Sequence, residues 1–327
     1  MRRLLVLFVA ACGALAVALV LWDPAPETEQ RFDRQQNGVW LGHKWYTGRH
    51  VRTGESVSAD ELAQLERNLS RHGIHDLFVH VGPSQEDGSI DDQPGRIFFS
   101  LRKTFTGARV LAWLGARVET ISLASPAFQE KLIDSLKELR EAGFDGVHFD
   151  FEPMADHEPG YLELLSRVRM KMGPDFMISQ ATPRASLMGL PPGPLRRSFW
   201  SEKFYRATMQ RSDQTVLMAY DSRFDYISAY LFFVSHQTGL LADWACSITG
   251  HELLIGIPSY EDVPLYSNPN VENIRTASLG VRSALEDRES PTPCLLGVSV
   301  YSNWVTDEEE WADFRRYWME PAETLSE

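Results

Sequence analysis

The run Asp145–Glu152, Asp-Gly-Val-His-Phe-Asp-Phe-Glu, carries acidic and imidazole side chains at a spacing that permits chemistry. Its β-branched and aromatic members predict a strand. Side chains on a strand alternate between two faces, so His148, Asp150 and Glu152 share one face. Neighbouring carboxyl groups, one with a raised pKa, perform glycoside hydrolysis. The alternative is a solvated face of an edge strand, but the aromatic half of the run favours burial.

Strand-like and helix-like segments alternate along the chain on both sides of this run. Most of the strand-like segments are near-continuous apolar runs, as expected of parallel strands covered by helices. The eight candidate strands are Val39–Trp45, Asp76–Val81, Val110–Leu114, Gly146–Glu152, Phe176–Gln180, Thr215–Tyr220, Leu253–Ile257 and Leu296–Tyr301.

Helix start and stop signals separate these strands. Ser58–Glu61 and Thr306–Glu309 have the pattern of capping boxes. Ser125–Pro126 predicts a helix start, and Gly143 predicts its end. Eight strand–helix units predict a single-domain (β/α)₈ TIM barrel. A doubly wound open sheet is the alternative, but no glycine-rich phosphate loop follows the first strand.

Polar and aromatic residues gather where the predicted strands end. Asp150 and Glu152 end the fourth strand, Met218–Asp221 the sixth, and Pro258–Glu261 and Asn303–Trp304 follow the seventh and eighth. Chemistry in this barrel takes place at the C-terminal ends of the strands. The sequence therefore predicts one functional rim.

The first residues predict a membrane segment. Arg2 and Arg3 precede the uncharged run Leu4–Trp22, whose 19 residues approach the thickness of a bilayer at about 1.5 Å per residue. The flanking charge favours a cytoplasmic N-terminus and an exported remainder. A cleaved signal peptide is the alternative, and Cys12 also lies in a faint lipoprotein-like processing pattern.

The chain thus divides into a membrane segment at 1–22, a polar linker at 23–36 and a barrel at 37–327. The formal net charge of −13 argues against a nucleic-acid partner. Cys246 and Cys294 either pair in an oxidising compartment or remain free thiols. We expect no metal and no cofactor, because no cysteine or histidine spacing suggests zinc.

With these motifs the chain resembles glycoside hydrolase family 18, the chitinase-like barrels. The family's strand-four signature D-G-x-D-x-D-x-E corresponds to Asp145–Glu152, with His148 in place of the first inner aspartate. Its Met-x-Tyr-Asp pattern corresponds to Met218–Asp221, and its Gly-x-Pro-x-Tyr pattern to Gly256–Tyr260. A tryptophan after strand eight is also familial, and Trp304 is the candidate.

The resemblance implies a mechanism in which the substrate's 2-acetamido oxygen attacks the sugar, so that no protein carboxylate does so. Glu152 would be the general acid, and Asp150 would orient the acetamido group. Tyr220 would donate a hydrogen bond to the acetamido oxygen, and Asp221 would bind hydroxyl or acetamido groups. His148 would bond to Asp150, unless it is a buried histidine bonded to Asp145 or to a neighbouring strand.

The expected substrate is an N-acetylhexosamine polymer or oligosaccharide outside the cytoplasm. The barrel would stay anchored to the membrane, or be secreted if the first segment is cleaved. Two other functions remain open: a glycan-binding protein on the same barrel, and a hydrolase of another glycan in which Asp221 or Glu261 supplies the second carboxylate. Besides the three catalytic candidates, we expect contacts with the substrate from Asp221, His148, Trp304, Tyr260, Asp145, Gln180, Arg184 and Trp113.

Overall fold

A computed structural model describes Gly13 and residues 30–186, 195–259, 268–288 and 291–320. The predicted membrane segment is outside this range apart from Gly13, as are Cys12, Tyr260 and Glu261. Within the described ranges, no helix combines the length and the apolar character needed to cross a bilayer.

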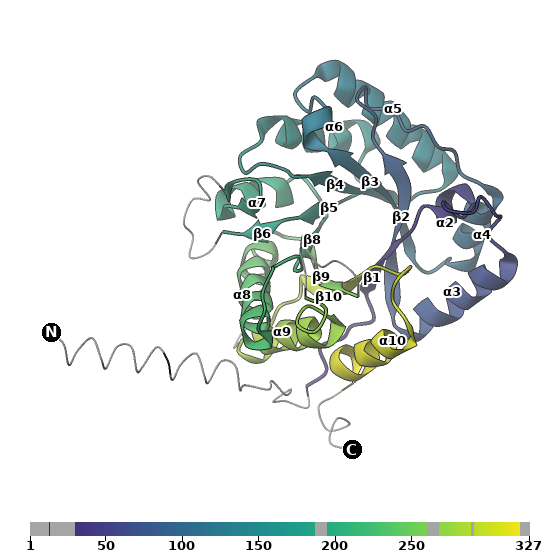
Figure 1. Ribbon diagram of the computed structural model, residues 1–327. Coiled ribbons are helices and arrows are strands. Elements are labelled where there is room, and N and C mark those ends of the chain that lie inside the picture. Colours follow the sequence, from purple (N-terminus) through teal and green to yellow (C-terminus); the bar gives the residue numbers. More distant parts are fainter. Residues whose placement is uncertain (1–12, 14–29, 187–194, 260–267, 289–290, 321–327) are drawn as a thin grey trace.

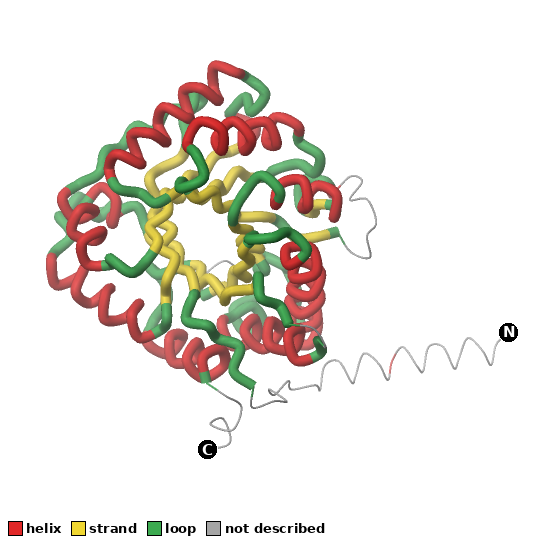
Figure 2. Tube along the Cα trace, turned by 180° about the vertical axis from the view of Figure 1, so that it is seen from behind, coloured by secondary structure: helices red, strands yellow, loops and turns green. Residues whose placement is uncertain are grey.

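Eight parallel strands close into a barrel, which confirms the predicted architecture and rules out an open sheet (Figures 1 and 2). Around the barrel the strand order is β1-β10-β9-β8-β5-β4-β3-β2. The barrel strands are β1 (Asn37–Leu41), β2 (Ile74–Pro83), β3 (Arg109–Arg117), β4 (Gly146–Glu152), β5 (Met177–Thr182), β8 (Gln214–Met218), β9 (Glu252–Pro258) and β10 (Leu295–Tyr301).

Each of the eight predicted strands corresponds to one of these, and the predicted bounds of β4 are correct. The first prediction, Val39–Trp45, extended too far. The strand ends at Leu41, and Trp45 lies in a short helix that closes at Gly48 with a φ of 79°. The apolar run continued past the strand because Trp45 is buried by packing in the helical layer instead.

Helices form the outer ring of the barrel (Figure 2). They are α2 (Lys44–Thr47), α3 (Ala59–Arg71), α4 (Arg96–Thr104), α5 (Pro126–Ala142), α6 (Pro159–Met172), α7 (Glu202–Met209), α8 (Ile227–Cys246), α9 (Ile274–Glu286) and α10 (Glu308–Phe314), with a short 3₁₀ helix η1 (Val118–Thr120) and a short π-helix η4 (Arg315–Met319). A two-stranded sheet, β6 (Arg184–Ala185) with β7 (Phe199–Trp200), lies beside β5.

The predicted helix ends are mostly correct. Ser58–Glu61 is a reciprocal capping box, and Ser125 caps α5, which ends at Gly143 with a φ of 108°. The box expected at Thr306–Glu309 is wrong by one residue, because Asp307 pairs with Glu310. The Thr306 hydroxyl instead donates to the carbonyl oxygen of Ser302, 2.8 Å away.

The strands bury two separate apolar layers. Val147, Phe149 and Phe151 of β4 belong to the large core between barrel and helices. A smaller cluster fills the barrel interior with Trp40, Phe78, Leu111, Trp113, Val216 and Leu254. Odd- and even-numbered residues of β4 therefore face opposite layers, as the alternation predicted.

The N-terminal end of the barrel is closed by a charged network at the starts of the strands. The Arg109 guanidinium lies 2.7 Å from carboxylate oxygens of both Asp76 and Glu252. The Gln214 amide also donates to Asp76, at 2.6 Å. Cys246 at the end of α8 forms a disulfide with Cys294 just before β10, which settles the alternative that the sequence left open.

Candidate active site

Strand β4 delivers Asp150 and Glu152 to the C-terminal mouth of the barrel. Asp150 is paired in register with Gly115, and Glu152 with Arg117, the last residue of β3. The Trp113 indole N–H donates to Asp150 Oδ2 at 2.8 Å, which fixes the orientation of that carboxyl group. The two acids thus come from consecutive inward positions of one strand, as the sequence predicted.

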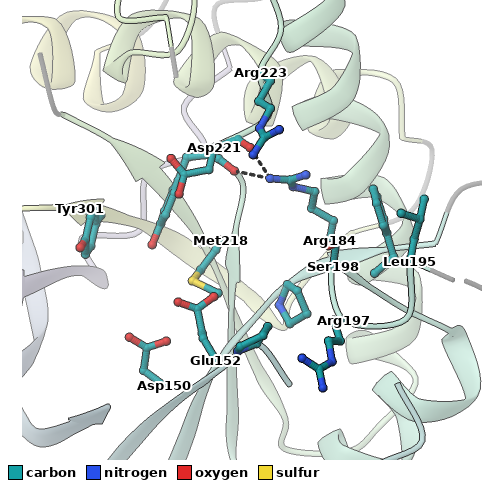
Figure 3. A pocket seen from close by; sticks show the side chains of 14 residues that line it. Asp150, Glu152, Arg184, Leu195, Arg197, Ser198, Met218, Asp221, Arg223 and Tyr301 are labelled. Atoms are coloured by element: carbon teal, nitrogen blue, oxygen red, sulfur yellow. Dashed lines mark hydrogen bonds between the residues drawn. The ribbon is translucent and has the colours of Figure 1, made fainter. Parts of the chain in front are cut away.

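These acids open into a pocket of about 520 Å³ (Figure 3). Its walls come from the ends of β4 and β5, from β6 and the segment leading into β7, and from the ends of β8 and β10. The lining residues are Asp150, Glu152, Pro153, Pro183, Arg184, Leu195, Arg197, Ser198, Phe199, Met218, Tyr220, Asp221, Arg223 and Tyr301.

The environment of Glu152 favours its protonated form. Burial raises the pKa of Glu152, and the charges of Asp150 and Asp221 raise it further, while Arg184 opposes them. A carboxyl group held in its acid form near neutral pH has the protonation state that general acid catalysis requires. Figure 3 shows Glu152 between Asp150 and the Asp221 side of the pocket.

Asp150 lies deeper than Glu152 and has one free oxygen. Burial raises the pKa of Asp150, and the Trp113 hydrogen bond lowers it in part. Asp150 Oδ1 is buried and has no hydrogen-bond partner within the described ranges. The two carboxyl groups therefore form a coupled pair in which charging one makes it harder to charge the other.

Tyr220 and Tyr301 form an aromatic wall beside the acids. Their rings stack at 5.2 Å with an interplanar angle of 16°. A side chain at Gly256 on β9 would approach both Tyr220 and Trp40 within 3.2 Å, so the glycine makes room for this packing. Tyr220 is one of the residues that line the pocket.

The loop after β8 holds Asp221 and Arg223 in the left-handed backbone region, with φ values of 55° and 62°. The buried Glu272 carboxylate accepts hydrogen bonds from the Ser222 hydroxyl at 2.7 Å and from the backbone N–H groups of Ser222 and Arg223 at 3.0 Å. The Arg184 guanidinium donates to the backbone oxygens of Tyr220 and Asp221 (Figure 3). These contacts fix the loop against the pocket.

His148 occupies the barrel interior below the pocket, which corrects its expected contacts with substrate and with Asp150. Its Nδ1 lies 2.7 Å from the Ser179 hydroxyl, directly across the β4–β5 register, and its ring stacks on Phe78 at 3.9 Å. Burial lowers the pKa of His148 to about 3, so the ring is neutral near neutral pH. The alternative of a buried histidine bonded to a neighbouring strand is the one observed.

Trp304 and Trp113 lie beside this wall as a parallel pair. Their rings are 6.1 Å apart with an interplanar angle of 8°, and both contact Tyr301. Trp304 is 49% exposed, whereas Trp113 is almost fully buried. Trp304 is thus the tryptophan of the pair that is accessible for stacking on a sugar.

Asp145 and Gln180 lie away from the pocket, so their expected contacts with substrate are wrong. Asp145 precedes β4 at the N-terminal end of the barrel, where it binds the backbone N–H of Val110 at 2.7 Å and Arg102. The Gln180 side chain points to the helical layer, where it accepts from the Tyr161 hydroxyl at 3.1 Å.

Among the residues that the sequence-based site did not include are Tyr301, Arg197, Arg223 and Glu272. Tyr301 ends an apolar strand and was indistinguishable from core. The other three depend on loops that the strand pattern does not place. Within the described ranges, no group of histidine, cysteine and acidic residues is arranged to hold a metal ion.

Comparisons with known proteins give matches in structure alone. Neither a family model nor a curated protein matches the sequence. A family GH18 chitinase from Chromobacterium violaceum superposes with a TM-score of 0.57 at 14% identity, over 90% of each chain. The spore cortex-lytic enzyme SleL of Bacillus cereus gives 0.57 at 12% identity, over 86% of this chain and 74% of that one.

A fungal endo-β-N-acetylglucosaminidase of glycosyl hydrolase family 18 also gives a TM-score of 0.57, at 16% identity, over 86% of this chain and 96% of that one. At identities this low, the superpositions show a shared fold but not a shared activity. The chain is therefore similar in fold to the glycoside hydrolase family 18 barrels.

Proposed function

We propose that the protein is a glycoside hydrolase that cleaves an N-acetylhexosamine-containing glycan, with Glu152 as the general acid. The observation that supports this most directly is the position of Glu152 beside Asp150 in an open pocket, with its pKa raised by burial and by neighbouring carboxylates. The solved structures with this fold include chitinases and an endo-β-N-acetylglucosaminidase, whose names indicate that they act on N-acetylhexosamine glycans.

In the proposed reaction Glu152 donates its proton to the glycosidic oxygen, and the bond from that oxygen to the anomeric carbon breaks. The substrate's 2-acetamido oxygen forms a bond to the same carbon, and Asp150 stabilises the positive charge that develops on the acetamido group. Tyr220 donates a hydrogen bond to that oxygen. The oxygen of a water molecule then forms a bond to the anomeric carbon, and the bond from that carbon to the acetamido oxygen breaks. The Glu152 carboxylate takes up the proton that the water loses, and the anomeric configuration is retained.

The same proposal includes export. The N-terminal apolar run would anchor the barrel to the membrane, or be removed by cleavage. The Cys246–Cys294 disulfide supports a compartment outside the cytoplasm, because disulfides persist mainly in oxidising environments. Fractionation of cells, with alkylation of free thiols before and after reduction, tests both points.

The test of activity uses chitin oligosaccharides and follows the anomeric proton of the new reducing end by NMR. The full chain should release a product with retained configuration, and Glu152→Gln should lower kcat by about 10²–10⁴-fold. Glu163→Gln removes an exposed glutamate from α6 and is the matched control. Oligosaccharides without the 2-acetamido group should not be cleaved.

Each other result points to a different function. Binding without turnover, in wild type and Glu152→Gln alike, would identify a glycan-binding protein on this barrel. Turnover of substrates that lack the acetamido group would assign a nucleophile or base to a protein carboxylate, with Asp221 the candidate that lines the pocket.

A further inference from the structure

One wall of the pocket carries three arginines, Arg184, Arg197 and Arg223, in a chain whose formal net charge is −13. A neutral sugar is recognised by hydrogen bonds and ring stacking and does not need a cluster of guanidinium groups. Arginine is the residue best suited to bind carboxylates, because its planar fork of donors matches their two oxygens.

The wall that carries Arg197 is rigidly attached to the barrel. The backbone N–H of Asp156 donates to the Arg196 carbonyl at 2.6 Å. Asp156 Oδ1 accepts from the backbone and hydroxyl of Ser201 at 2.9 Å, and the Trp200 indole donates to Met154 at 2.9 Å. The described part of this segment, from Leu195 onward, is thus held against the loop that follows Glu152.

Arg184 is oriented before any ligand arrives. Gln237 on α8 binds both backbone groups of the next residue, Ala185, at 2.7 and 3.0 Å. The guanidinium lies over the rings of Phe199 and Phe233, at 5.8 and 6.0 Å from their centres. Such a fixed cation loses little freedom on binding an anion.

Arg197 has a partner that a ligand can replace. Its guanidinium lies 2.7 Å from Glu119, and the two side chains are 57% and 40% exposed. Exposed ion pairs contribute little free energy, so breaking this one costs little. With Glu152 in its acid form, the three arginines of the pocket outnumber the remaining lining carboxylates, Asp150 and Asp221.

We propose that this wall binds a carboxylate carried by the sugar next to the cleaved N-acetylhexosamine, so that the substrate is an acidic glycan. The proposal rests on the proposed hydrolase function and narrows its substrate class. Two kinds of sugar supply this chemistry: an N-acetylhexosamine with a lactyl ether, as in N-acetylmuramic acid, and a hexuronic acid.

Binding is measured in the full-length Glu152→Gln protein, where turnover cannot interfere. Calorimetry compares three tetrasaccharides: the N-acetylglucosamine–N-acetylmuramic acid repeat, the N-acetylglucosamine–glucuronic acid repeat, and neutral chitotetraose. At least one acidic probe should bind tighter than chitotetraose, and raising the salt concentration should reduce the advantage. Which acidic probe binds tighter identifies the source of the carboxylate.

Arg197→Gln and Arg223→Gln, each added to Glu152→Gln, should weaken acidic binding by roughly 10-fold and neutral binding much less. Arg67→Gln, which removes an exposed arginine from α3, is the charge-matched control and should change neither. Thermal melts establish that every variant is folded.

Two results would overturn this proposal and leave the hydrolase function standing. Chitotetraose could bind as tightly as the acidic probes or more tightly, or neither arginine variant could weaken the binding of the acidic probes. Binding of none of the probes also overturns it. If an acidic probe binds through the arginines but wild type cleaves neither acidic nor neutral glycans, the carboxylate site stands and the hydrolase function fails.

Discussion

At the N-terminal end of the barrel Arg109 lies between Asp76 and Glu252, whereas at the C-terminal end Asp150 and Glu152 lie beside each other on one strand. Burial opposes the charge of Asp76, but hydrogen bonds from His75, Arg109 and Gln214 and the charge of Arg109 outweigh it and lower the pKa. Burial and the neighbouring carboxylates together raise the pKa of Glu152.

Carboxyl groups therefore have a lowered pKa at the N-terminal end and a raised pKa at the mouth. At the N-terminal end each carboxylate has a cation within hydrogen-bond distance, and the network joins strands that are far apart in sequence. At the mouth, the acids keep an unfavourable arrangement, which in the proposed hydrolase would serve proton transfer. Functional sites commonly hold such strain at a cost in stability. Mutations at the two ends should therefore separate stability from activity.

The largest effect on folding is expected for Arg109→Gln. Removing the guanidinium leaves Asp76 buried without its cation, and breaking a buried pair in this way costs about 3–5 kcal/mol of unfolding free energy. Urea unfolding of the full chain measures the loss. The pH profile of the remaining folded enzyme should keep its shape, because the network lies at the opposite end from the pocket. A shifted profile would show that the two ends are coupled.

The disulfide at the N-terminal end should have the next largest effect. Cys246 and Cys294 are separated by 48 positions, and loss of a crosslink of this span costs about 2–4 kcal/mol. Cys246→Ser and Cys294→Ser should each lower the unfolding free energy by that amount, with kcat retained at temperatures where the protein is folded. Equal stability of the reduced and oxidised wild type would contradict this.

At the mouth, Trp113→Phe should reduce activity, and the smaller ring in the barrel interior should also lower the unfolding free energy. The substitution removes the N–H that donates to Asp150, and a hydrogen bond to a charged group contributes about 1.5–3 kcal/mol, or roughly 10–100-fold in kcat/KM. Because the Trp113 bond lowers the pKa of Asp150, its loss should move the acidic limb of the pH–rate profile to higher pH. Trp311→Phe, which removes a buried indole N–H that has no hydrogen-bond partner among the residues that the structure describes, is the control. An unmoved acidic limb would leave Trp113 as a packing residue.

The sequence predicted the barrel and the acid pair because both depend on local periodicity. Alternation along β4 alone places Asp150 and Glu152 on one face. Alternation does not show how deep each side chain lies in the barrel. His148 was therefore expected at the level of the pocket, whereas it lies in the barrel interior below it. On β5, Ser179 and Gln180 are adjacent polar residues on opposite faces, so the sequence did not show which of the two faces inward, and Gln180 was assigned to the wrong face.

Arg184 was expected from the sequence, but the other two arginines of the wall were not, for a different reason. Arg223 reaches the pocket because Glu272, far along the chain, binds the loop after β8. Arg197 reaches it because Asp156 and Ser201 join two loops. Contacts between loops at such sequence separations leave no periodic signal, so the acids were found from the sequence and the cations opposite them were mostly missed.

The smallest expected effect concerns the stability of Glu152→Gln at different pH values. The folded-state pKa of Glu152 is raised from 4.5 to about 8, so between these values the folded protein binds more protons than the unfolded chain. Wild-type stability should therefore contain a term that falls as pH rises through this window. Glutamine does not titrate, so the variant lacks this term.

Thermal melts of both proteins from pH 4 to 9 should show the melting temperature of Glu152→Gln rising relative to wild type toward the alkaline end. The rise should be small, because the Glu152 residue is exposed at the mouth and solvent screens its charge. Asp76 contributes the opposite trend, lost as pH falls, but it is present in both proteins and cancels in the difference. Glu163→Gln should show a constant difference from wild type. If Glu152→Gln does so as well, Glu152 titrates normally, and the contrast between the two ends of the barrel disappears along with the case for a general acid.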